Sequence, residues 1–118
     1  MTLPHWWSRA QRVARTFQSS TKGERTARHS VYVILLHDPA REGRWGLYVG
    51  QTARDPDWRF DQHKAGYRSS AAVRRFGVRL VPDLFQHLNP VSEWESRELE
   101  EAMADAFRSI GIWVEGGH

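Results

Sequence analysis

The sequence predicts a small α/β (α+β) domain in which a three-stranded, mostly antiparallel sheet is flanked by helices, with an N-terminal helical arm. Two strand-like segments lie close together, at residues 31–36 and 44–50, and a third with alternating polarity follows at 77–81. Segments with helical periodicity lie before and after them. At 118 residues, the chain has the length of one domain.

The N-terminal part of the chain is predicted to be a basic helical arm. In residues 4–17, apolar side chains recur on one face in the manner of an amphipathic helix, at Trp6, Ala10, Val13 and Phe17. The polar, basic residues that follow are typical of a linker. We therefore divide the chain into a helix and linker at 1–29 and a domain at 30–118.

The two central strands are predicted to form a hairpin. Residues 31–36 are β-branched and apolar, and the run is too short for an independent helix. Turn-forming residues at 38–43 separate them from the second strand, which favours antiparallel pairing across a longish loop. We expect the stretch GLYVGQT, residues 46–52, to end the second strand and enter a turn.

Capping residues mark the later helices. Asp55 and Pro56 are typical of a helix start and Gly66 of a helix end. Ser69 or Ser70 is expected to begin a short second helix through residue 75. A last helix, to residue 110, carries the apolar stripe Leu99, Met103, Phe107 and Ile110 and is stopped by Gly111. Residues 112–114 form a short final strand or an extended segment.

Composition excludes several kinds of chemistry. The chain has no cysteine, and therefore no disulfide, thiolate nucleophile or zinc–cysteine site. No apolar run approaches the roughly 18 residues of a membrane span, and the first residues lack the apolar core of a signal peptide. We therefore expect a cytoplasmic protein that does not enter a membrane.

Charge is distributed unevenly along the chain. Residues 1–30 contain six Lys/Arg and one acid, whereas residues 81–118 contain two Arg and eight acids. A basic surface favours a polyanion such as nucleic acid. A solvated charged surface without a partner is the alternative.

Two tyrosines on the neighbouring strands are candidate reactive groups. Tyr32 and Tyr48 lie on the two strands of the hairpin, and the side chain of Tyr48 points away from those of Leu47 and Val49. The alternative is ordinary strand packing, because tyrosine favours strands.

Arg59 and His63 are spaced so that they share one face of the helix after the hairpin. A guanidinium offers several donors in one plane and is a good clamp for phosphate. A histidine transfers protons near neutral pH or binds phosphate. The alternative is a pair of surface residues without chemistry.

Glu100 lies on or beside the apolar stripe of the last helix. A carboxylate in that position needs a cation, a metal or a hydrogen-bond donor. Its hard oxygens suit Mg²⁺ or Mn²⁺ bound together with a substrate phosphate. The alternative is a residue at the rim that reaches water or pairs with Arg59.

Taken together, these residues resemble the motifs of the GIY-YIG nuclease superfamily. Ser30-Val31-Tyr32 is similar to the first motif, and Tyr48-Val49-Gly50 to the second. Arg59 with His63 resembles the helix arginine and the histidine four residues later, and Leu99-Glu100 resembles the segment with the metal-binding glutamate. The similarity covers residues 30–110 in order and spacing, and the closing WVEGGH is similar to the end of small bacterial members.

Three positions depart from that resemblance. Ser30 stands where the first motif has glycine, and Leu35 stands where some members carry a lysine. No asparagine follows the last helix, where several of these nucleases use one.

The resemblance implies an endonuclease that hydrolyses phosphodiester bonds, in DNA more than RNA, with Mg²⁺ or Mn²⁺. One tyrosine would deprotonate the attacking water, either Tyr32 assisted by Tyr48 or the reverse. Arg59 would stabilise charge on the phosphate, Glu100 would hold the metal, and His63 would move a proton or contact the substrate. Gly50 would let the backbone turn sharply above Tyr48.

Basic residues outside this set are candidate nucleic-acid contacts: Lys64, Arg68, Arg74 and Arg75 in the domain, and Arg9 and Arg12 in the arm. Two other functions stay open. One is a nucleic-acid-binding module of the same fold without cleavage, and the other is a protein-interaction domain in which these side chains form an ion-pair network.

Overall fold

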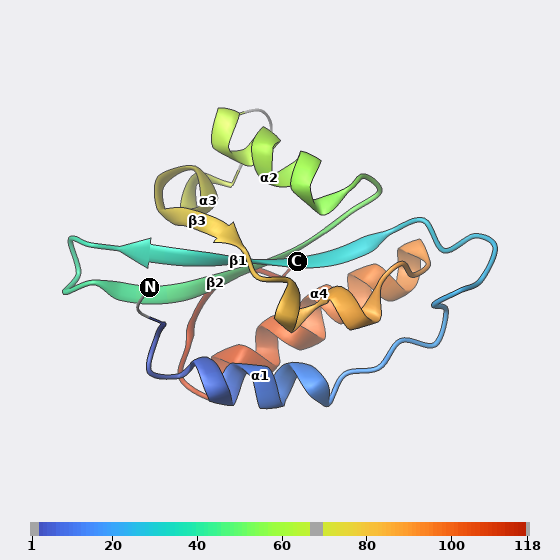
Figure 1. Ribbon diagram of the computed structural model, residues 1–118, viewed down its shortest axis with the longest axis horizontal. Helices are drawn as coiled ribbons and strands as arrows, with labels where there is room; N and C mark the ends of the chain where they lie inside the picture. Colours follow the sequence, from blue (N-terminus) through green and yellow to red (C-terminus); the bar gives the residue numbers. More distant parts are fainter. Residues whose placement is uncertain (1–2, 67–69, 118) are drawn as a thin grey trace.

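The sheet has the strand order β3-β1-β2-β4 in the computed structural model, which describes residues 3–66 and 70–117 (Figure 1). β1 (Ser30–Asp38) pairs antiparallel with β2 (Arg44–Thr52) and with β3 (Gly77–Leu80), and β4 (Trp113–Gly116) pairs parallel with β2. Within the described residues, four strands and four α-helices make an α+β domain.

The expectation of a three-stranded sheet is wrong, because Trp113–Gly116 form a fourth strand, β4, where the sequence predicts a short final strand or an extended segment at 112–114. A parallel pair needs a long crossover, and α4 (Glu93–Ser109) supplies it by returning the chain beside β2. The sequence indicates a strand or an extended segment here, but its residues do not show which strand it pairs with. The sheet is therefore mixed.

The helices cover the two faces of the sheet (Figure 1). α2 (Pro56–Ala65) and α3 (Ala71–Phe76) lie on one side, and α1 (Trp7–Arg15) and α4 lie on the other. Two short 3₁₀ helices, η1 (Pro82–Leu84) and η2 (Gln86–Leu88), connect β3 to the segment before α4; the sequence did not predict them.

The predicted helix caps are confirmed. The Asp55 side chain accepts a hydrogen bond from the Asp57 backbone N–H at 2.8 Å, and Gly66 ends α2 in the left-handed conformation with φ of 88°. The Ser70 side chain caps α3, whereas Ser69 lies outside the described residues. Gly111 follows α4 with the same positive φ.

The register of β2 decides which side chains share a face. Tyr32 lies opposite Gly50, and Glu115 lies opposite Tyr48, so these side chains all point to the face covered by α2 and α3. Leu47, like the other residues of opposite parity, points toward α4. The active-site candidates on the strands therefore share one face.

Two glycines inside β2 make room for aromatic rings from the adjacent strands. A Cβ atom added to Gly46 would lie 2.5 Å from the Trp113 ring, and one added to Gly50 would lie 2.5 Å from the Tyr32 ring. The expected sharp turn at Gly50 is wrong, because β2 continues to Thr52. Gly50 instead allows Tyr32 to cross over β2.

The core lies mainly between the sheet and α4, where Leu99, Met103 and Phe107 are buried. Trp6 and Trp7 belong to the same core, so the tryptophans at the start of the chain are packing residues. No helix in the described part of the chain combines the length and the apolar character that crossing a bilayer requires.

Glu95 connects α4 to the linker that precedes β1. Its carboxylate accepts hydrogen bonds from the backbone N–H and the hydroxyl group of both Ser20 and Thr21. The Thr21 hydroxyl oxygen also accepts the Ser92 backbone N–H at 2.8 Å. Burial alone would raise the pKa of Glu95, but these hydrogen bonds outweigh it and lower the pKa to about 2.

Replacing Glu95 by Gln is expected to destabilise the fold by about 3 kcal/mol at pH 7, because an amide cannot accept all four hydrogen bonds and leaves donors unpaired. The folded pKa of Glu95 lies below its ordinary value of 4.5. The stabilisation is therefore present above pH 4.5 and is lost as the pH falls toward 2. Urea denaturation from pH 7 to 3 measures this, with the exposed Glu98→Gln as the control. Equal stability of the two variants at pH 7 would contradict the assignment.

Candidate active site

The five residues predicted to carry catalysis gather around the two tyrosines. Tyr32, Tyr48, Arg59 and His63 lie on the face of the sheet beneath α2, whereas Glu100 belongs to α4 on the other side, and its charge reaches both tyrosines. The five residues come from four elements: Tyr32 from β1, Tyr48 from β2, Arg59 and His63 from α2, and Glu100 from α4. The structure therefore brings together side chains that lie up to 68 positions apart in the sequence.

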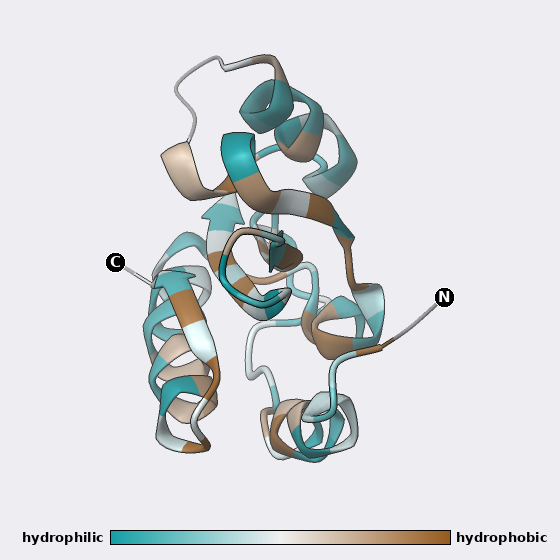
Figure 2. Cartoon of the chain, turned by 90° about the vertical axis from the view of Figure 1, so that its left-hand side faces the viewer, coloured by the Kyte–Doolittle hydropathy of each residue, from teal (hydrophilic) through white to brown (hydrophobic). Residues whose placement is uncertain are grey.

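His63 is the one fully buried residue of α2, an outer helix that is mostly hydrophilic (Figure 2). Its Nε2 lies 2.8 Å from the Tyr32 hydroxyl oxygen, and its Nδ1 accepts the Ser70 backbone N–H at 3.1 Å. Because Nδ1 is an acceptor, the imidazole is neutral and carries its proton on Nε2. Burial, with the charge of Arg59, lowers the pKa of His63 to about 4 and keeps this form at neutral pH.

The two tyrosines are coupled, and their environments differ. Their ring centroids lie 6.2 Å apart; Tyr32 is buried and Tyr48 is half-buried. Since Tyr32 accepts the His63 Nε2–H, its own proton is directed away from His63. The hydrogen-bonding interaction between the phenols raises the pKa of Tyr32 and lowers that of Tyr48, as expected if Tyr32 donates to the Tyr48 oxygen.

The pKa values of both phenols lie above the ordinary tyrosine value. Burial is the main cause in each case, and the charge of Glu100 raises the pKa of Tyr48 further. Arg59 acts in the opposite direction on both. Tyr48 is the more accessible of the two phenols, so it is the better candidate for a general base.

Arg59 lies one helical turn before His63 and is half-buried. Its positive charge acts on Tyr32, Tyr48 and His63, so the guanidinium lies within electrostatic reach of all three. A guanidinium in that position is able to donate to a phosphate beside Tyr48.

Glu100 is buried, with 7% of its surface exposed, at the edge of the sheet. The pairing of β2 with β4 ends at Val49. Two residues later on β2, the backbone amide of Gln51 interacts with the Glu100 carboxylate. Burial raises the pKa of Glu100 to about 7, opposed by the charge of Arg97 and by the Gln51 amide. Burial therefore disfavours its charged form, which a cation would stabilise.

The donor set around Glu100 fits one kind of metal ion. Within the described residues, no group of three or more His, Asp or Glu side chains is placed to bind a metal. Mg²⁺ keeps several waters and binds through one or two carboxylates together with substrate phosphates. A single buried carboxylate that favours a cation fits that mode, and Mn²⁺ accepts the same oxygen ligands.

The other predicted nucleic-acid contacts divide into two groups. Arg74 and Arg75 are exposed on α3, on the tyrosine side of the sheet, and Lys64 donates there to the carbonyl oxygens of Arg74 and Gly77 at 3.4 and 3.0 Å. Arg9 and Arg12 are exposed on α1, on the opposite side of the sheet, so they do not converge with the tyrosines (Figure 1). Arg68 lies outside the described residues.

Sequence reasoning missed the backbone amides of Ser70 and Gln51, which fix His63 and Glu100, because a backbone group has no residue-type signal. It also missed Glu95, although a serine three residues before it gives the spacing of a capping box.

Comparisons with protein-family models, with curated proteins and with solved structures found no match to this chain.

Proposed function

We propose that the protein is a metal-dependent endonuclease of the GIY-YIG type that hydrolyses phosphodiester bonds in DNA. The observation that carries this proposal is the buried hydrogen bond between His63 and Tyr32 beside Tyr48, whose ring centroid lies 6.2 Å from that of Tyr32, with the charges of Arg59 and Glu100 acting on Tyr48. Packing alone does not require a buried histidine with both ring nitrogens engaged beside a pair of phenols.

In the proposed mechanism, Tyr48 in its phenolate form takes a proton from the attacking water as the water oxygen bonds to phosphorus. The bond from phosphorus to the leaving sugar oxygen breaks, and that oxygen takes a proton from solvent water. Tyr32 would donate a hydrogen bond to the Tyr48 phenolate oxygen without transferring its proton, and His63 holds Tyr32 in that orientation. His63 is thus a positioning residue that stays neutral, because both of its nitrogens are occupied. Tyr48, the more accessible phenol, is the general base.

Arg59 acts twice in this mechanism. It donates to the phosphate as negative charge builds on the oxygens, and its positive charge lowers the pKa of Tyr48. Glu100 and the substrate phosphate would hold one divalent ion, which polarises the phosphate and offsets the carboxylate charge that raises the pKa of Tyr48.

Purified protein with Mg²⁺ or Mn²⁺ should cut at least one of single-stranded, duplex and branched DNA. Replacing Arg59 by Ala is expected to reduce the cleavage rate by about 10²- to 10³-fold, because charge on the phosphate loses a preorganised donor. Arg12→Ala, which removes the same charge on the opposite side of the sheet, is the control and should cleave like the wild type.

The same experiment separates the proposal from the two alternatives. DNA binding that weakens steeply with salt, without cutting of any substrate, would favour the binding module. No DNA binding at low salt would favour the protein-interaction domain. Cleavage that Arg59→Ala leaves unchanged would remove Arg59 from the mechanism.

A further inference from the structure

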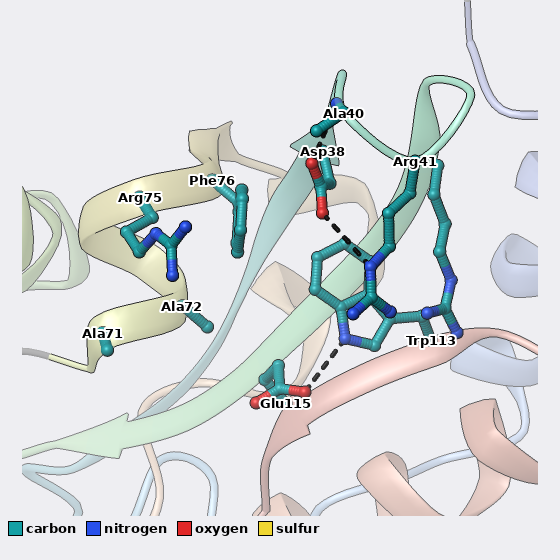
Figure 3. Close-up of a pocket in the computed structure, with 10 residues that line it drawn as sticks. Asp38, Ala40, Arg41, Ala71, Ala72, Arg75, Phe76, Trp113 and Glu115 are labelled. Atoms are coloured by element: carbon teal, nitrogen blue, oxygen red, sulfur yellow. Dashed lines mark hydrogen bonds and ion pairs between the residues drawn. The ribbon is translucent and has the colours of Figure 1, made fainter.

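A cavity of about 590 Å³ lies on the same face of the sheet as the tyrosines (Figure 3). Its lining comes from the end of β1, the β1–β2 loop, α3 and β4. Figure 3 shows Arg75 and Phe76 reaching in from α3, with Trp113 and Glu115 on β4 across from them. Its volume is in the range of pockets that bind small organic ligands.

The two carboxylates of the cavity already have partners. Asp38 accepts the Ala40 backbone N–H at 3.0 Å and lies 3.8 Å from the Arg41 guanidinium. Glu115 accepts the Trp113 indole N–H at 2.9 Å. These contacts hold the β1–β2 loop and the Trp113 indole in place. They also occupy carboxylate oxygens that would otherwise be available to another cation.

Two further arginines line the cavity, Arg44 and Arg75, and both are exposed. Within the described residues, neither forms an ion pair with a carboxylate. With Arg41, the cavity has three guanidinium groups against two carboxylates, and thus a net positive charge. Guanidinium groups placed in this way favour a phosphate.

The cavity also presents aromatic surface. The Arg44 guanidinium lies 5.0 Å from the centre of the Trp113 ring, and the Phe76 ring meets that indole edge-on at 5.6 Å. Both rings are half-buried, so part of each is accessible. Gly46 is required for this arrangement, because a larger residue would displace the indole. Rings beside cations are the combination that binds nucleotides, since bases stack on the rings.

The cavity adjoins the candidate active site. Two residues that line the cavity, Trp113 and Glu115, lie on β4 opposite Gly46 and Tyr48 of β2. They are two positions apart, so their side chains point to the same face and lie about 7 Å apart along the strand. Because Glu115 lies directly across from Tyr48, the cavity begins at the neighbouring strand, about 5 Å from the Tyr48 backbone. A strand whose phosphate lies beside Tyr48 would therefore place its next nucleotide at the cavity.

We propose that this cavity binds the nucleotide next to the cleaved phosphodiester in an unpaired strand, with Arg44 and Arg75 on its phosphate and Phe76 against its base. A base within an intact duplex is stacked and paired and is not free to enter, so the preferred substrate has a single-stranded segment. The position of the cleaved bond rests on the proposed function, whereas nucleotide binding by the cavity does not.

The test compares two double variants that remove the same charge from opposite sides of the sheet, Arg44→Ala/Arg75→Ala and Arg9→Ala/Arg12→Ala. All four residues are exposed, so both proteins should fold, which thermal unfolding verifies. Fluorescence anisotropy in EDTA measures the affinity for a labelled oligothymidylate of about ten nucleotides.

The cavity variant is expected to bind about tenfold more weakly, with a salt slope smaller by about 1.4 for two lost phosphate contacts. The α1 variant should bind within about twofold of the wild type. Phe76→Leu should weaken oligonucleotide binding by about fivefold or more, because it removes the ring on which a base would stack. The Arg75 guanidinium lies over that ring at 5.1 Å, and since the variant keeps this arginine, competition by inorganic phosphate should change less than oligonucleotide binding does. Thymidine monophosphate should compete better than inorganic phosphate, and a duplex should compete less well than the single strand.

Equal losses in the two double variants, or no loss in the cavity variant, would overturn the cavity proposal even if the protein cuts DNA. Absence of oligonucleotide binding by the wild type would also overturn it. Binding that depends on the cavity, without cleavage when metal is added, would support the cavity and refute the nuclease.

Discussion

Replacing Tyr48 by Phe is expected to slow DNA cleavage by about 10²- to 10⁴-fold, because it removes the hydroxyl group of the proposed general base while keeping the aromatic ring. The loss of stability should be limited to about 1 kcal/mol, because Tyr48 is half-buried and only the Tyr32 hydroxyl group loses an acceptor. Single-turnover cleavage at saturating protein, together with thermal unfolding, measures the two quantities.

Tyr32→Phe is the matched control. We expect it to lower the stability of the fold more than Tyr48→Phe does, and to lower the cleavage rate less. It leaves the buried Nε2–H of His63 without an acceptor, so it should destabilise the fold by about 1–3 kcal/mol. It should slow cleavage by only about ten- to a hundredfold, because Tyr48 retains its own oxygen and loses one donor. A larger rate loss for Tyr32→Phe than for Tyr48→Phe would make Tyr32 the base and reverse the assignment.

Replacing Glu100 by Gln is expected to reduce metal-dependent cleavage by about two to three orders of magnitude, because the carboxylate that would hold the ion is lost. The variant should fold at least as well as the wild type at pH 8. The pKa of Glu100 is raised to about 7, so its charged form is disfavoured by burial, and the neutral amide avoids that cost.

The raised pKa of Glu100 also predicts how metal affinity depends on pH. A metal ion binds the deprotonated carboxylate, so the affinity for Mn²⁺ should fall about tenfold for each pH unit below 7 and level off above it. Calorimetric titration of the wild type and Glu100→Gln with Mn²⁺ measures this, and the variant should show no such dependence. The exposed Glu101→Gln is the control and should retain cleavage. Unfolding of Glu100→Gln would mark Glu100 as structural.

Much of the fold follows from local signals in the sequence. Asp55 and Pro56 start α2 and Ser70 starts α3 because a cap depends on residues that are adjacent in the chain. β4 could not be predicted in the same way. Its pairing with β2 depends on where α4 returns the chain, and on Gly46 leaving room for Trp113 across β2.

The candidate site shows the same division between local and distant causes. The spacing of Arg59 and His63 predicts a shared helix face, because the helical repeat is local. The direction of the hydrogen bonds is not local, because it depends on the Ser70 amide at His63 Nδ1. The proposal of Tyr48 as the base, in place of Tyr32, therefore rests on contacts that the sequence does not reveal.

The hydrogen bonds of Glu95 to Ser20 and Thr21 have a consequence for truncated forms of the protein. A chain that starts at residue 30 would lack the donors to a buried carboxylate and the tryptophans that complete the core, and it would uncover the surfaces of α4 and η1 that α1 contacts. Such a chain would tend to associate through the uncovered apolar surface. An inactive truncated chain would then report failed folding, and the chemistry of Tyr48 is best measured with the N-terminal segment present.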